Sequence, residues 1–258
     1  MENDLLLLSG NDIPFYGAQV SIHQPTIKEI AYIGEEAFYT GCEFLRFSKD
    51  KLTEEDRNSL ENKTNFEIIM SIIREQNITI QQQKTAVLML LSLIFPNYTI
   101  HFNVDTIDLG KPDTDEVFKI TSKNYDEFLD ILNSMFCLKA TIGNADDYAA
   151  EGELAKRIAD KLRKRHQKIA EQQSESKKKV AILSRYVSII ATGQQKNIND
   201  ILGYTVYQLF DEFQRYQLKI NFDIYLQAKM AGAKDLEEVD DWMKDIHSDT
   251  IEWKKKKK

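Results

Sequence analysis

The chain has 258 residues, of which 42% are hydrophobic and 29% charged, close to the average for soluble globular proteins. Its 10 glycines and 4 prolines are too few for collagen-like or Pro-rich low-complexity sequence, and they disfavour an all-β fold with many tight turns. With 34 Lys and Arg against 41 Asp and Glu, the net charge of −7 argues against a DNA-coating protein, because phosphate binding depends on Lys and Arg.

The first 140 residues predict a mixture of helices and strands. Residues 20–23 alternate apolar and polar side chains, which is typical of a short strand. Thr26 with Glu29, and Thr64 with Glu67, have the spacing of helix capping boxes, so we expect helices over about 26–47 and after Thr64. A further apolar run predicts a helix over about 80–95, ended by Pro96.

Alternation returns at residues 98–104 and, with the apolar residues at 107–109 and 117–120, predicts two or three antiparallel strands. Asn124, followed by Glu127, predicts the cap of a helix that ends near Phe136. We therefore predict an α+β fold that is mostly helical, with a small antiparallel sheet in the N-terminal domain and an all-helical C-terminal domain. The expected divisions are an N-terminal domain at 1–140, a linker at 141–153, a C-terminal domain at 154–250 and a basic tail at 251–258.

Residues 154–179 form a basic segment with ten Lys and Arg against three acidic residues. One interpretation is a surface for nucleic acid or an acidic partner. The other is a solvated helix face or a protein contact, since Lys and Arg favour helices and the aromatic residues of a single-strand platform are missing. We favour the second, so nucleic acid is not the expected partner. The candidate basic patch is Lys156, Arg163, Lys164 and Lys168.

No motif in the chain indicates catalysis. There is no Gly-rich phosphate loop, nucleophile elbow or zinc-binding spacing, and the four histidines fall in separate predicted elements. Cys42 and Cys137 are interpreted as buried thiols, and the pair Glu35-Glu36 as solvated helix surface. We therefore expect no enzymatic activity, no cofactor and no metal.

Nothing in the sequence predicts a membrane segment or a signal peptide. The longest apolar run, residues 86–95, is shorter than the roughly 20 residues that a bilayer requires. The N-terminus lacks the basic region and cleavage site of a signal peptide. We expect a soluble intracellular protein.

The most distinctive segment is a long helix predicted over about 203–230, which carries seven aromatic residues within 22 positions. Its apolar residues cover most of the circumference, so the helix either lies at the centre of a bundle or is covered by a partner. A short helix is expected to begin near residue 239. The candidate partner-binding residues are Tyr204, Tyr207, Phe213, Tyr216, Tyr225 and Trp242.

Four stretches of the chain resemble a known family. They are IHQPTIKEI at 22–30, YQLFDEFQRY at 207–216, AKMAGAK at 228–234 and DWMKDI at 241–246. Together they are similar to tail assembly chaperones of long-tailed bacteriophages, of the type found in phages and prophages of Gram-positive bacteria. The resemblance implies a non-enzymatic protein of the host cytoplasm that binds the tape measure protein, helps recruit tail tube subunits and is absent from the mature virion.

Members of that family are made in two lengths by ribosomal frameshifting. Lys254–Lys258 requires a run of A-rich codons, which suits such a site, although a plain basic tail explains it equally well. In the chaperone interpretation Phe210 is a core residue, whereas Tyr207 and Tyr225 contact the partner. The alternatives are a structural virion protein of the head–tail region or baseplate, and a nucleic-acid-binding regulator that uses residues 154–179. The oligomeric state stays open, a homo-oligomer included.

Overall fold

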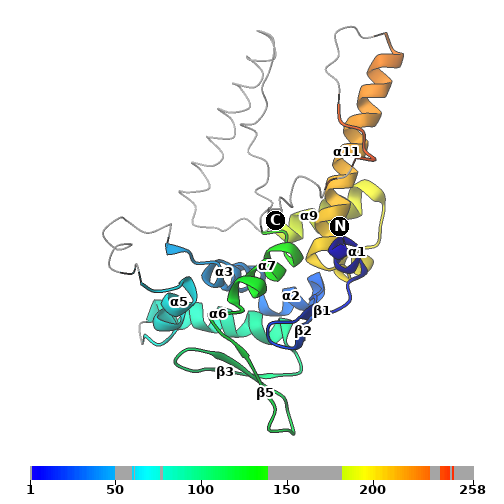
Figure 1. Cartoon of the computed structure of the whole chain (residues 1–258). Coiled ribbons are helices and arrows are strands. Elements are labelled where there is room, and N and C mark those ends of the chain that lie inside the picture. The colour runs from blue at the N-terminus through cyan, green and yellow to red at the C-terminus, as the bar shows by residue number, and fades with distance from the viewer. Residues whose placement is uncertain are drawn as a thin grey trace.

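The structure is a computed structural model that describes residues 2–49, 60, 62–75, 78–138, 182–232, 239–244 and 246 (Figure 1). The expected linker, the basic tail and the candidate basic patch lie outside these residues. What the sequence indicates about them therefore stays a prediction.

Helices build most of the N-terminal part of the described chain. The Thr26 hydroxyl accepts a hydrogen bond from the backbone N–H of Glu29, whose carboxylate accepts one from the N–H of Thr26. Thr64 and Glu67 repeat this arrangement, so both predicted capping boxes are confirmed. The helices are α2 (Ile27–Ile33), α3 (Glu35–Leu45), α5 (Asn65–Ile73), α6 (Ile78–Ile94) and α7 (Tyr125–Met135).

The single helix predicted over 26–47 is instead two, α2 and α3, because Gly34 separates them with a φ of 87°. Glycine adopts such a positive φ without steric strain. α3 then packs closely on α6: a Cβ at Gly41 would lie 2.8 Å from the carbonyl oxygen of Ala86. Only glycine permits this approach between the two helices. α6 ends before Pro96, as predicted.

Two small antiparallel sheets complete the N-terminal part. β1 (Ile13–Phe15) pairs with β2 (Val20–Ile22) in a hairpin, of which the sequence predicted only the second strand. The larger sheet has the order β3-β4-β5. Its strands are β3 (Thr99–Phe102), β4 (Ile107–Gly110) and β5 (Val117–Ile120). The α+β class, mostly helical with small antiparallel sheets in the N-terminal part, is confirmed.

α7 begins after Asn124 as predicted, with Asn124 at the N-cap position, but the predicted side-chain cap is wrong. The Asn124 side chain makes no capping hydrogen bond; its amide donates instead to the carbonyl oxygens of Gly17, at 2.8 Å, and Lys119, at 3.0 Å. The Glu127 carboxylate accepts hydrogen bonds from the backbone N–H groups of Tyr16 and Gly17. Both side chains stabilise the turn between β1 and β2, so a tertiary contact replaces the local one.

The C-terminal part of the described chain is helical. It comprises α9 (Ile182–Gln194), α10 (Ile198–Leu202) and the long helix α11 (Val206–Met230). α11 begins at a third capping box, formed by Thr205 and Gln208. The N-terminal helix α1 (Glu2–Ser9), which the sequence did not predict, lies against α11. The Gln208 amide joins them by donating a hydrogen bond of 2.7 Å to the carbonyl oxygen of Leu8.

A hydrophobic core is shared by the N-terminal and C-terminal parts. Phe38 and Phe128 from the first part are fully buried. Leu183, Ile190 and Leu209 from the second part are at most 2% exposed and belong to the same cluster. The two parts therefore pack as one body in the described residues.

The capping boxes of α2 and α11 lie side by side. Thr26 and Thr205, the two N-cap residues, form an isolated antiparallel β-bridge. The backbone N–H of Ile27 donates to the carbonyl oxygen of Tyr204 at 2.8 Å. Helices separated by about 170 residues of sequence thus begin at a common point in the fold.

A second junction is made by Glu35, the first residue of α3. Its carboxylate accepts hydrogen bonds from the backbone N–H groups of Ile182 and Leu183, the latter at 2.8 Å. These N–H groups open α9, and among the described residues Glu35 is the acceptor that they have, so Glu35 caps α9 from another element. The prediction that Glu35 is only solvated helix surface is wrong.

We predict that Glu35→Ala lowers the free energy of unfolding by about 1 kcal/mol, the usual cost of losing a helix cap. The control is Glu36→Ala, which removes the neighbouring exposed carboxylate and should change stability by less than about 0.5 kcal/mol. Urea unfolding of both variants is the measurement. Equal effects would contradict a capping role for Glu35.

Glu29 makes stability depend on pH. Partial burial acts to raise the pKa of Glu29, but hydrogen bonds from Thr26 and the proximity of His23 outweigh it and hold the pKa below its ordinary value of 4.5. The folded state therefore favours the charged form. The resulting stabilisation is present above pH 4.5 and is lost as the pH falls through the lowered folded-state pKa.

We expect Glu29→Gln to be less stable than the wild type near neutral pH, and the difference to narrow as the pH falls from about 7 toward about 2. Thermal unfolding across this range is the measurement. Glu36→Gln serves as the control for removing a nearby exposed carboxylate. A difference that stays constant with pH would show that the charge of Glu29 does not contribute.

Candidate functional site

The two halves of α11 lie in different environments. Its first turns belong to the core, where Val206, Tyr207 and Leu209 are buried. Its 25 residues make a helix about 37 Å long at 1.5 Å per residue, and its second half projects from the body (Figure 1). Exposed apolar residues gather on this projecting half: Ile220 (37%), Ile224 (59%), Leu226 (39%) and Met230 (88%).

Tyr207 is a core residue and not the partner-facing one that the sequence suggested. It is 5% exposed, because α1 covers the side of α11 that lies off the apolar stripe. Burial and then the nearby carboxylate of Asp4, on α1, raise the pKa of the Tyr207 phenol. The ring therefore contributes to folding and offers no free surface to another protein.

Two further candidates, Phe213 and Tyr216, pack against α9. Phe213 stacks on Tyr186 with 4.0 Å between ring centroids, and Phe210 meets the same ring edge-on at 5.1 Å. The Tyr216 hydroxyl lies over Gly193, where a Cβ would be 1.9 Å away. These half-buried rings attach the first half of α11 to α9, so the site stands on a rigid pair of helices.

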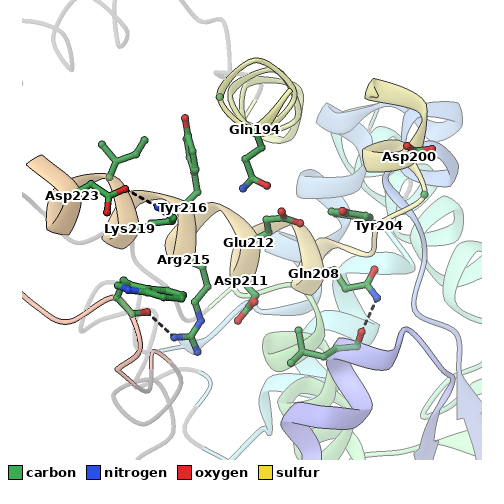
Figure 2. Close-up of a pocket in the computed structure, with 15 residues that line it drawn as sticks. Gln194, Asp200, Tyr204, Gln208, Asp211, Glu212, Arg215, Tyr216, Lys219 and Asp223 are labelled. Atoms are coloured by element: carbon green, nitrogen blue, oxygen red, sulfur yellow. Dashed lines mark hydrogen bonds and ion pairs between the residues drawn. The ribbon is translucent and has the colours of Figure 1, made fainter. Parts of the chain in front are cut away.

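A groove of about 1070 Å³ runs along α11. Figure 2 shows a row of side chains along the helix, with Gln194 entering from α9 and Asp200 from α10. Both polar and apolar side chains line it. The apolar lining comes from several elements and consists of Leu8, Tyr204, Tyr216, Ile220 and Trp242.

The groove carries a small negative charge. Four carboxylates and two cations line it, which gives a formal charge of −2: Asp200, Asp211, Glu212 and Asp223 against Arg215 and Lys219. Lys196 donates hydrogen bonds to Glu212 and, at 3.1 Å, to the Tyr204 hydroxyl. Partial burial acts to lower the pKa of Lys196, but these two contacts outweigh it and raise the pKa.

Residues 239–244, which we name the strap, return alongside α11 as the short red segment of Figure 1. Asp241 shapes the strap as a turn: its carboxylate accepts the backbone N–H of Met243 at 2.9 Å, and its carbonyl oxygen accepts that of Lys244 at 3.0 Å. The described part of this segment is therefore a turn where the sequence predicted the start of a helix. The local hydrogen bonds of an aspartate turn replace the helical ones.

Arg215 ties the strap to α11. Its guanidinium donates to the carbonyl oxygens of Trp242, at 3.3 Å, and Lys244, at 2.6 Å. Trp242 is 38% exposed and lines the groove. Tyr225, further along the helix, is half-buried and has the ammonium group of Lys229 5.6 Å from its ring centroid.

The thiols are poor nucleophiles at neutral pH. Cys42 is buried and Cys137 half-buried. Burial raises the pKa of Cys42 and raises that of Cys137 to about 12. In the described part of the chain no three His, Cys, Asp or Glu residues converge as metal ligands. Of the helices described, none is long and apolar enough to cross a membrane.

Sequence analysis did not identify Arg215, Lys196 or Glu212. Arg215 binds main-chain carbonyl groups 27 and 29 residues further on, and main-chain acceptors leave no residue-type signal. Lys196 and Glu212 are 16 residues apart, in a loop and a helix. Neither spacing is a known motif, so only the folded chain brings these groups together.

Comparison with known proteins gives one finding for this region. Residues 174–247 match the family model described as the second domain of YomV, a Bacillus prophage protein. The matched residues include α9, α10, α11 and the strap, and they are well under half of the chain. No curated protein and no solved structure matches the chain. Residues 174–247 are thus similar to a phage-related domain, and this region supplies all of the groove lining except Leu8.

We predict that Tyr207→Ala lowers the free energy of unfolding by about 3 kcal/mol, since it removes a buried ring from the core. Tyr225→Ala, on the projecting half of the same helix, should cost at most about 1 kcal/mol. Chemical unfolding of the two variants is the measurement. A loss for Tyr225→Ala as large as that for Tyr207→Ala would mean that the projecting half is needed for folding.

Proposed function

We propose that this chain is a non-enzymatic tail assembly chaperone of a phage or prophage, which binds an apolar helix of the tape measure protein and helps recruit tail tube subunits. The observation that carries the proposal is the exposed apolar half of α11. A helix that is apolar over most of its circumference is stable in water when another element covers it. We expect the tape measure protein to supply that cover.

The energetics suit a helix as the partner. Burial of apolar surface yields about 25 cal/mol per Å², so a contact that hides about 400 Å² of apolar area gains on the order of 10 kcal/mol before the entropic cost of association. Ile220 and Ile224 lie four residues apart, on one face of α11. Their spacing matches the way an amphipathic helix places its side chains in a groove.

The charge of the groove adds a criterion for the partner. Its lining has a formal charge of −2, which becomes −1 when Lys196, the partner of Glu212, is counted, so a helix with Lys or Arg beside its apolar stripe is favoured over an acidic one. Long-range attraction of this kind raises the rate of association more than the final affinity. We therefore expect the bound segment to be both apolar and basic.

The matched family is phage-related, which supports the phage setting of the proposal. The match also covers the helices α9, α10 and α11, which form most of the groove. As a chaperone, the protein would act in the host cytoplasm, without a cofactor, and leave before the virion is complete. A longer form made by frameshifting at Lys254–Lys258 belongs to the same proposal. Sequencing the codons of this run and the frame downstream tests it.

The main test is co-expression with the tape measure protein encoded in the same genome. Ile224→Glu places a charge in the exposed apolar surface and should reduce the soluble tape measure protein at least tenfold while leaving thermal unfolding unchanged. Asn221→Glu is the control, since it adds the same charge at an exposed polar site on α11. If both variants solubilise the partner as the wild type does, this surface is not the binding site.

A second measurement separates the chaperone from a structural virion protein. Mass spectrometry of purified virions should find the tail tube subunit and not this chain. Its presence at tail tube stoichiometry would overturn the chaperone assignment and favour the structural one.

A further inference from the structure

We infer that the strap, residues 239–244, is an internal competitor of the partner: it covers part of the groove in the free protein and leaves when a partner helix binds. This inference rests on the proposed function and adds regulation of the same site. Its basis is that the strap lies in the same groove as Ile220, the first of the exposed apolar residues along α11. Trp242 of the strap and Ile220 of α11 both line that groove.

The strap is a preformed turn and not an arbitrary stretch of chain. Asp241 holds it through the backbone N–H groups of Met243 and Lys244, and an ion pair of 2.8 Å between Lys244 and Asp240 closes it on the outside. Because these contacts lie within the strap, its shape does not depend on its seat against α11. It can leave the helix as a unit.

The attachment to α11 is narrow. Among the described contacts, the hydrogen bonds between strap and helix are the two from Arg215 to the carbonyl oxygens of Trp242 and Lys244. Both acceptors are main-chain groups and are readily satisfied by water when the strap leaves. Met243 stays 68% exposed, so the apolar contact of the strap falls mainly on Trp242, which is still 38% exposed. We therefore expect the strap to act as a latch that binds α11 weakly and leaves it reversibly.

The consequence is a threshold for binding. If the partner can enter only when the strap is displaced, its apparent dissociation constant is the intrinsic one divided by the fraction of protein with the strap open. Loosening the strap therefore tightens binding. A protein that must bind the tape measure protein and later release it would gain from such a latch, because strap closure promotes release.

The strap is tested first without a partner. In a Trp253→Phe background, Trp242 is the fluorescent reporter, since the chain has two tryptophans. Arg215→Ala should shift its emission to the red, make it more accessible to acrylamide and increase the binding of 8-anilinonaphthalene-1-sulfonate to the freed apolar surface. The control is Lys219→Ala, which removes a cation one turn away that pairs with Asp223. Equal signals from the two variants would overturn the latch.

Competition is tested with the tape measure protein. Arg215 itself lines the groove, so the decisive variant is Asp241→Ala, which disrupts the turn and leaves α11 intact. We expect Asp241→Ala to bind the tape measure protein at least threefold more tightly than the wild type, and Gln217→Ala, at an exposed position of α11 outside the groove lining, to bind as the wild type does. Equal affinity of Asp241→Ala and wild type would overturn the inference alone. Failure of every protein to bind would overturn the proposed function, and the inference with it.

Discussion

The position of the groove depends on the bridge between Thr26 and Thr205. Each threonine caps a helix, and each cap is closed by a side chain three residues on, Glu29 in α2 and Gln208 in α11. The bridge places the two capped ends side by side and thereby sets where α11 leaves the body. A 25-residue helix is stiff, so its starting point and direction decide which residues of its far half are exposed to solvent.

The same junction explains where α1 packs against the body. Gln208 closes the α11 cap with its carbonyl oxygen and uses its amide group to hold the carbonyl of Leu8. One side chain therefore serves the start of α11 and the end of α1. With α1 in place, Tyr207 is covered, and the surface of α11 that is open to a partner begins only further along the helix. The bridge therefore helps to decide which aromatic residues of α11 are buried in the core and which lie at the surface.

The site combines rigid and loose components. α9 and α11 are joined by the stacked rings of Tyr186 and Phe213, and α9 is capped by Glu35 of the N-terminal body, so one wall of the groove is firmly supported. The strap is attached through Arg215 alone among its described hydrogen bonds. A fixed helix face beside an easily displaced segment is a suitable arrangement for binding that must be reversible. This contrast motivates both proposals made for the groove.

The sequence by itself determined what depends on near neighbours in the chain. Capping boxes at Thr26 and Thr64, the stop before Pro96 and the alternation in β3 are local patterns, and they correctly indicated helices, strands and the α+β class. Only the tertiary structure decided which groups meet across long separations. Glu35 caps α9, and Arg215 binds the strap, because folding brings distant backbone groups to them, and backbone groups are the same at every residue and leave no mark in the sequence. The periodicity of α11 likewise showed an apolar helix, but its neighbours in the fold decided which of its rings are buried and which remain open to a partner.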